Sequence, residues 1–164
     1  MIKEWKSGRW PRKNSIKLWF DTYKDYYNFD NRVVKVEEIY DNVDFTKPYM
    51  DISAPAFKME DLEGDTLSKV IIDNILNRKE KIQITAEVMD IVNNMFQFKP
   101  NYGSFFWHGD IQLKNFILQP DFKVRLVDPD SFIHINFDDP SHADFEMGKV
   151  INSFYRLKGA LTND

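Results

Sequence analysis

The stretch WHGDIQLKNFIL, residues 107–118, interrupts an apolar run with polar residues and then resumes it. His108, Asp110 and Asn115 are the polar positions, and the apolar run returns at residues 116–118. Burial of such groups costs free energy unless they are hydrogen-bonded or used in chemistry. The pattern therefore indicates either a well-bonded loop between two core segments or a site of chemistry.

The residues that follow predict a β-hairpin. Two short apolar runs, 116–118 and 124–127, flank a Gln-Pro-Asp segment that is typical of a turn. Asp128 ends the second run. Because the open ends of an antiparallel hairpin lie side by side, we expect Asp128 to face the loop that carries Asp110 and Asn115. Two carboxylates and an amide oxygen around one point suit Mg²⁺, with phosphates as its remaining ligands.

Periodicity predicts the other elements. Helices are expected over 14–29, from about 65 to 75, over 81–97 and over 141–157. Strands are expected over 32–40 and 56–60, with a loop containing Asp44, Pro48 and Pro55 between them. This order is that of an α+β protein and not of a parallel βαβ array. We expect a small mixed lobe and hinge over residues 1–64 and a mostly helical lobe, carrying the hairpin, over residues 65–164.

Composition sets limits on the class of protein. The 164 residues are 43% hydrophobic and 15% aromatic, as in a packed globular chain, and the absence of cysteine excludes disulfides, thiolate catalysis and zinc–cysteine sites. Residues 1–17 hold six basic residues and one acidic residue, a net charge of +5 against −9 for the remainder. We expect a solvated basic arm and no nucleic-acid partner. Without a signal sequence or an apolar run near the ~18 residues of a membrane span, the expected location is cytoplasmic.

The segment HGDIQLKN, residues 108–115, has the pattern His-x-Asp-x₄-Asn, and a strand-ending Asp follows it. This pattern resembles that of the kinase-like phosphotransferases, and Gly109 makes it more similar to the aminoglycoside phosphotransferase and choline kinase branch. The resemblance implies a protein-kinase-like fold that uses ATP and Mg²⁺. It implies that Asp110 is the catalytic base acting on a hydroxyl of a small-molecule acceptor, that Asn115 and Asp128 hold Mg²⁺, and that His108 braces the loop.

A second segment, FKMEDLEGDTL at residues 57–67, resembles the last strand and hinge of the amino-terminal lobe in that family. A strand, an acidic residue, a glycine and a helix follow one another in the expected order. The resemblance implies that the backbone around Glu60, Asp61 and Leu62 bonds the edge of the adenine. Asp144 is similar to an acidic residue that hydrogen-bonds the catalytic loop in the family.

The amino-terminal part departs from the family pattern. Lys3 is the candidate for the strand lysine that contacts the phosphates, but the helix expected over 14–29 has no Glu to pair with it. Gly8 stands alone where the family has a glycine-rich loop. The chain therefore resembles a minimal or truncated kinase-like protein, and a partner chain, self-association or an upstream segment would complete its short lobe.

Three functions are open on these residues. The first is the phosphotransferase described above. The second is a catalytically inactive nucleotide-binding pseudokinase or scaffold, which the absent phosphate-covering loop favours. The third is a metal-dependent phosphohydrolase, although its histidines lack an organised ligand spacing. Its ligands would be His108, Asp110, Asp128, His134 and Asp144.

Overall fold

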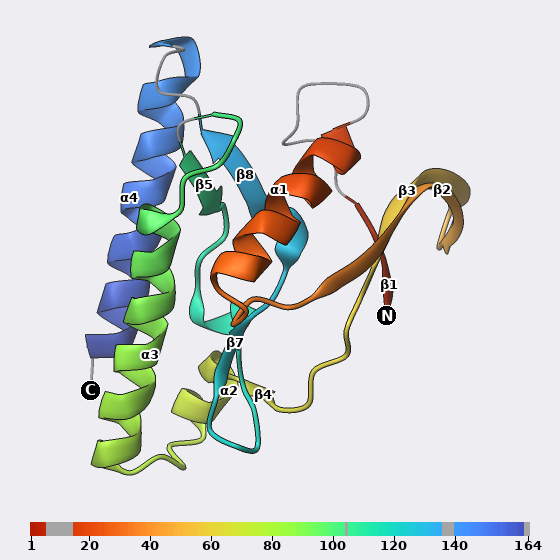
Figure 1. Ribbon diagram of the computed structural model, residues 1–164. Helices are drawn as coiled ribbons and strands as arrows, with labels where there is room; N and C mark the ends of the chain where they lie inside the picture. The colour runs from red at the N-terminus through yellow and green to blue at the C-terminus, as the bar shows by residue number, and fades with distance from the viewer. Residues whose placement is uncertain (6–14, 104, 136–139, 163–164) are drawn as a thin grey trace.

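The computed structural model describes residues 1–5, 15–103, 105–135 and 140–162, with the backbone alone at 15, 47 and 140–146 (Figure 1). Over these described ranges the chain is a mixed α+β protein with helices and three small antiparallel sheets. The α+β class expected from the sequence is therefore confirmed. In the described ranges, none of the helices is long and apolar enough to cross a membrane.

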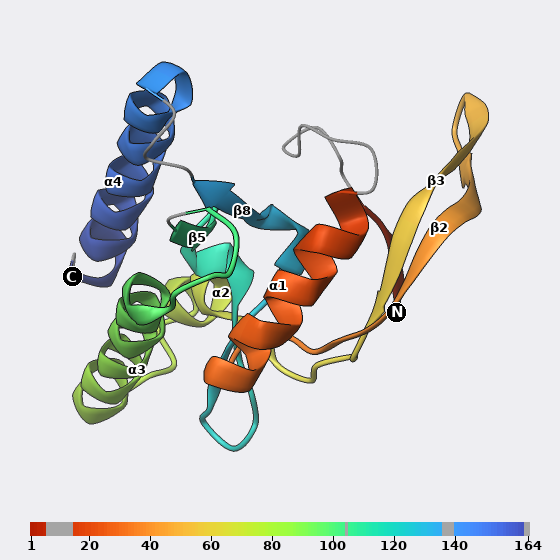
Figure 2. The same ribbon diagram turned by 45° about the horizontal axis from the view of Figure 1, so that its top comes forward.

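The amino-terminal sheet consists of β1 (Ile2–Glu4), β2 (Val36–Lys47) and β3 (Met50–Met59) in the order β1-β3-β2. Figures 1 and 2 show the β2–β3 hairpin extending away from the rest of the molecule. The loop expected over residues 41–55 is wrong, because β2 and β3 remain paired up to Lys47 and Met50. None of the described side chains from 41 to 55 is buried, so backbone pairing, and not burial, holds this part of the hairpin.

Helix α1 (Ser15–Phe29) joins the amino-terminal sheet to the remainder of the core. Trp19 packs against Phe57 of β3 with ring centroids 5.2 Å apart, and Tyr23 contacts Phe132 at 5.4 Å. The buried positions are Ile16, Trp19, Tyr23 and Tyr26. This spacing of three, four and three residues follows one face of a helix.

A second sheet contains β4 (Asp65–Thr66), β6 (Phe116–Leu118) and β7 (Val124–Leu126) in the order β4-β6-β7. Its β6–β7 hairpin has the register Phe116↔Leu126, Ile117↔Arg125 and Leu118↔Val124. The hairpin predicted from residues 116–127 is confirmed. A parallel bridge from Val33 to Leu126 ties the start of the β2 segment to this sheet.

Two helices follow β4 in the chain. Helix α2 (Leu67–Ile72) is shorter than expected and leaves Ile75 67% exposed outside it. Helix α3 (Arg78–Gln97) begins three residues earlier than expected, because Asn77 and Glu80 form a capping box. Its buried residues lie along one face of the helix. That face consists of Ile84, Val88, Ile91, Val92 and Met95.

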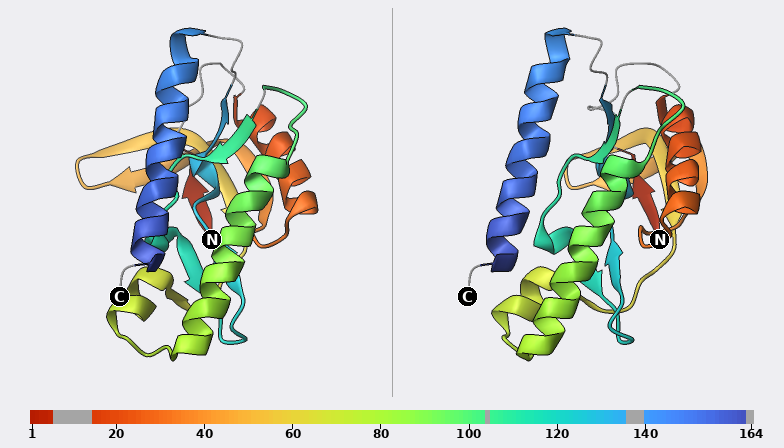
Figure 3. Two further views of the ribbon diagram at one scale, coloured as in Figure 1. Left: turned by 90° about the vertical axis from the view of Figure 1, so that its left-hand side faces the viewer. Right: turned by 60° about the vertical axis from the view of Figure 1, so that its left-hand side comes forward.

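Strands β5 (Phe105–His108) and β8 (Phe132–Ile135) form a third, two-stranded antiparallel sheet that the sequence did not predict. Seven of its eight residues are buried, so its sequence lacks the alternation of a half-exposed strand. Helix α4 (Pro140–Thr162) buries Val150 and Leu157 against the core. Figure 3 shows the segment after β5 running alongside α4.

Candidate functional site

The candidate loop, residues 109–115, joins β5 to β6 and ends in a single 3₁₀ turn, Leu113–Asn115. At its start, the Gly109 amide donates to the carbonyl of Ser131 at 2.7 Å. At its end, the Val127 amide donates to the carbonyl of Asn115 at 2.8 Å. Both ends of the loop are therefore fastened to the segment that follows β7, as the hairpin geometry predicted.

His108 braces the candidate loop from the interior. Its side chain is fully buried, and its Nδ1 accepts from the Asp110 amide at 3.2 Å. Nδ1 therefore carries no proton, and Nε2–H donates to the carbonyl of Val127 at 2.9 Å. With both ring nitrogens engaged, His108 links the loop to the Asp128 segment.

Asp110 is oriented by its neighbours in the loop. The Asn115 Nδ2 donates to the backbone carbonyl of Asp110 at 2.7 Å and to its Oδ2 at 3.2 Å. The Gln112 amide donates to Oδ1, and the Lys114 ammonium lies 3.6 Å from Oδ2. The Asp110 side chain is 36% exposed, so its carboxylate is accessible yet held in place. Because Asn115 uses its nitrogen here, its side-chain oxygen is the atom left for a cation.

Asp128 adopts a left-handed backbone conformation, with φ 65° and ψ 57°. This conformation is uncommon for a residue with a Cβ and concentrates at functional sites. Ser131 stabilises this conformation with two hydrogen bonds. Its amide donates to the Asp128 carbonyl at 3.0 Å, and its hydroxyl donates to Oδ2 of Asp128 at 2.6 Å. The Trp19 indole donates to the carbonyl of Pro129 at 3.0 Å and fixes the same turn to α1.

Lys3 reaches this turn from β1. Its ammonium bonds Oδ1 of Asp128 and lies 2.9 Å from Oδ1 of Asp130. Asp130 is only 4% exposed and was not expected to belong to the site. The signal that could have indicated it is the spacing Asp-x-Asp directly after a strand, which places two carboxylates in one tight turn.

The charges of this cluster are strongly coupled. Burial favours the neutral form of Asp128, but the bonds from Lys3 and Ser131 outweigh it and hold its pKa well below the usual range. Burial and the neighbouring Asp128 raise the pKa of Asp130, although Lys3 opposes them. Burial disfavours the charged form of Lys3, but the two carboxylates more than compensate and raise its pKa. The cluster is thus a pair of carboxylates that share one cation.

The expected hinge residues lie between β3 and β4. The Glu60 amide already donates to the carbonyl of Lys35 at 3.0 Å, and its carboxylate bonds Arg125 and the Lys35 amide. Glu60 therefore ties the hinge to the β7 sheet, and its amide is not available to adenine. Asp61 is exposed and Leu62 is half-buried. Of the three amides that the resemblance implied, those of Asp61 and Leu62 are left for a purine edge.

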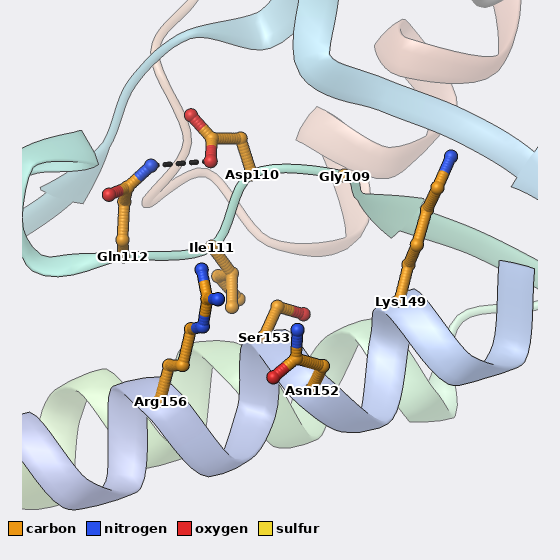
Figure 4. Close-up of a pocket in the computed structure, with 8 residues that line it drawn as sticks. All are labelled: Gly109, Asp110, Ile111, Gln112, Lys149, Asn152, Ser153 and Arg156. Atoms are coloured by element: carbon orange, nitrogen blue, oxygen red, sulfur yellow. Dashed lines mark hydrogen bonds between the residues drawn. The ribbon is translucent and has the colours of Figure 1, made fainter.

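A cavity of about 160 Å³ lies between the candidate loop and α4. We call it the loop–α4 cavity (Figure 4). Figure 4 shows the Asp110 carboxylate turned toward the Gln112 amide and away from α4, whose polar side chains lie on the other side of the loop backbone. The full lining is Gly109, Asp110, Ile111, Gln112, Lys149, Asn152, Ser153 and Arg156. The four residues from α4 were not predicted, because their only sequence signal is their spacing along one helix face.

His134 and Asp144 are the remaining candidates. His134 lies on β8, where its Nε2 is 3.0 Å from the Thr22 hydroxyl and burial lowers its pKa to about 4. The side chain of Asp144 lies outside the described residues, as do residues 6–14 of the basic arm. Within the part of the chain that the structure describes, no group of three or more His, Cys, Asp or Glu residues is arranged to hold a metal.

Comparison of the chain with protein-family models and with curated protein sequences finds no match.

Proposed function

We propose that the protein is an ATP- and Mg²⁺-dependent phosphotransferase with a protein-kinase-like fold, acting on a hydroxyl of a small-molecule acceptor. The observation that carries the proposal is the meeting of Lys3, Asp128 and the loop of Asp110 and Asn115, which come from three separate parts of the chain. Lys3 bonds Asp128, while Val127 bonds both His108 and Asn115. These are the groups that kinase-like enzymes use to position phosphates, metal and acceptor.

The donor set fits Mg²⁺. Asp128 and Asp130 share the ammonium of Lys3, so the turn already binds a positive charge. Carboxylate oxygens and the free amide oxygen of Asn115 are hard donors of the kind that Mg²⁺ prefers. Bound Mg²⁺ would neutralise the charge on the nucleotide phosphates. Asp128 and Asn115 would hold it, Asp130 would support it, and Lys3 would then be released to contact a phosphate.

Asp110 would act as the base. Gln112 and Asn115 hold its carboxylate, and the Lys114 ammonium lies 3.6 Å from its Oδ2. In the proposed step the acceptor hydroxyl oxygen forms a bond to the γ-phosphorus of ATP while the bridging bond to the β-phosphate breaks. The hydroxyl proton passes to Asp110 and ADP leaves. Catalysis would come mainly from positioning and charge stabilisation.

A nucleotide-binding pseudokinase is the second candidate. The contact of Lys3 with both Asp128 and Asp130 favours it, because an ammonium held in this way competes with Mg²⁺. The sequence also has a single glycine, Gly8, ahead of the hinge. On this interpretation the chain binds ATP but transfers no phosphoryl group. The metal-dependent phosphohydrolase is not favoured, since both nitrogens of His108 already have partners.

The test begins with calorimetric titration of ATP into the chain, with and without Mg²⁺. Magnesium-dependent binding that is lost in Asp128→Ala is expected. ADP formation is then measured with a panel of hydroxyl acceptors in the wild type and in Asp110→Asn, which keeps the shape of the side chain but not the base. We expect Asp110→Asn to bind Mg-ATP as the wild type does and to lose about 10²–10⁴-fold in turnover.

Each result selects one function. Turnover that survives in Asp110→Asn would rule out the role of Asp110. ATP binding without turnover by the wild type, on any acceptor, would favour the pseudokinase. Absence of ATP binding in both conditions would overturn both nucleotide-based functions for this chain alone. Far-ultraviolet circular dichroism of each variant establishes that the fold is retained.

A further inference from the structure

We propose that the acceptor carries an anionic group, a carboxylate or a phosphate, in addition to its reactive hydroxyl, and that Arg156 in the loop–α4 cavity binds this group. The inference rests on the proposed function, since it assigns a substrate class to the same site. It is carried by the cavity and by the residues that α4 places in it.

Helix α4 presents a polar stripe to the cavity. Its members are Lys149, Asn152, Ser153 and Arg156. They follow the i, i+3, i+4, i+7 spacing of a single helix face. A neighbouring stripe of α4 is apolar and packs into the core, which fixes the rotation of the helix. That stripe consists of Met147, Val150, Phe154, Leu157 and Leu161.

The lining of the cavity includes two basic side chains, Lys149 and Arg156, although the whole chain has a net charge of −4. Arg156 is exposed and makes no ion pair with any residue in the described ranges. A guanidinium offers a planar fork of donors that matches a carboxylate or a phosphate.

The cavity is lined by the loop on one side and by α4 on the other. Figure 4 shows Arg156 extending from α4 toward the loop, whereas the Asp110 carboxylate is turned away from α4, toward the Gln112 amide. Because Asp110 and Arg156 line the same cavity, an acceptor whose hydroxyl reaches Asp110 would place its anionic group at Arg156. Asn152 and Ser153 lie between Lys149 and Arg156 on the stripe and offer neutral hydrogen-bonding groups. The guanidinium of Arg156 would repel positively charged acceptors such as choline or aminoglycosides.

The test compares four small alcohols: D-glycerate, glycerol 3-phosphate, glycerol and choline. Binding of each to the chain is measured by calorimetry without nucleotide, and ADP formation is measured with Mg-ATP. The variant is Arg156→Gln. Its matched control is Arg78→Gln, because Arg78 is an exposed arginine at the start of α3 and does not line the cavity.

We expect D-glycerate or glycerol 3-phosphate to bind at least roughly tenfold more tightly than glycerol or choline. Arg156→Gln should weaken this binding roughly tenfold, and Arg78→Gln should leave it unchanged. The preferred anion distinguishes a carboxylate from a phosphate. Where turnover is measurable, Arg156→Gln should raise KM for the anionic alcohol with little change in kcat.

The inference and the proposed function can fail separately. Anion binding that depends on Arg156 without any turnover would support the anion site and count against the phosphotransferase. Turnover on glycerol or choline that does not depend on Arg156 would overturn the anionic acceptor and leave the phosphotransferase in place. Absence of anion binding, or equal binding by both arginine variants, would also overturn the inference.

Discussion

The ammonium of Lys3 and the carboxylate of Asp130 lie 2.9 Å apart although 127 positions separate them in the chain. The same ammonium bonds Asp128, so one cation from β1 holds two carboxylates of the turn after β7. Removal of a shared cation from a partly buried acidic pair leaves like charges beside each other. The contact is therefore both a structural link between the first strand and the site and a competitor for any metal that binds there.

The first prediction concerns Lys3→Met. We expect it to lower the free energy of unfolding by about 1–3 kcal/mol, because Asp130 loses its charged partner while it remains buried. Mg²⁺ should restore more stability to this variant than to the wild type, since the metal would take the place of the ammonium. Urea unfolding of both proteins, with and without Mg²⁺, measures the difference.

Lys58→Met is the matched control for this substitution. Lys58 is also on the amino-terminal sheet and pairs with Glu37 at 2.8 Å, but this pair is exposed. Exposed ion pairs contribute little to stability, and no Mg²⁺ response is expected. Equal effects of the two substitutions, or a Lys3→Met variant that is insensitive to Mg²⁺, would contradict the shared-cation interpretation.

The second prediction concerns Gly64, which has φ 132° at the end of the hinge. A Cβ at this position would lie 2.2 Å from the carbonyl oxygen of Leu118 on β6. Gly64→Ala should therefore destabilise the chain by more than about 2 kcal/mol, through both backbone strain and the collision. Thermal unfolding followed by circular dichroism provides the measurement.

Gly148→Ala is the control for Gly64. Gly148 lies within α4, and a Cβ there would meet nothing within 4 Å. Alanine in a helix interior is favoured over glycine by about 0.5–1 kcal/mol, so a small gain in stability is expected. Similar losses in both variants would show that the hinge does not impose the conformation of Gly64.

The third prediction concerns pH. Burial lowers the pKa of His134 from 6.5 to about 4, so between these values the unfolded chain binds a proton that the native chain excludes. Stability therefore falls as the pH decreases through this window, by at most about 3 kcal/mol from this residue. In His134→Asn this part of the pH dependence should disappear. Unfolding free energies measured at several pH values test this, and an unchanged slope in the variant would contradict it.

The local sequence was sufficient to predict the hairpin on which the candidate site depends. Asp110, Asn115 and Asp128 were expected to lie near one another because a hairpin between residues 116 and 127 brings its open ends together, and this hairpin is present. The sheet of β5 and β8 could not be predicted from periodicity, since strands buried on both faces lack an alternating pattern. In the exposed β2–β3 arm, Asp44, Pro48 and Pro55 indicated a loop, although Val43, Phe45 and Ile52 alternate with polar residues there.

Charge pairs between distant segments had no local signal. The partners of Lys3, Asp128 and Asp130, follow β7. The sequence around Lys3 does not indicate them. The contribution of Arg156 to the loop–α4 cavity depends on how α4 docks, which is set by the burial of Val150 and Leu157. Such contacts are decided by tertiary packing, so they become visible only when the elements are placed in space.

The last prediction concerns Ser131, a buried residue that is 6% exposed. Its hydroxyl donates to Oδ2 of Asp128 at 2.6 Å. Ser131→Ala removes this bond, raises the pKa of Asp128 toward its usual value and loosens the carboxylate. Groups that orient a metal ligand typically change metal affinity by 10–100-fold, so Mg²⁺-dependent ATP binding should weaken by about tenfold. Ser53→Ala, on the exposed part of β3, should leave it unchanged. Equal Mg²⁺ affinity in the two serine variants would mean that Asp128 does not hold the metal, and would leave the turn after β7 with a structural role alone.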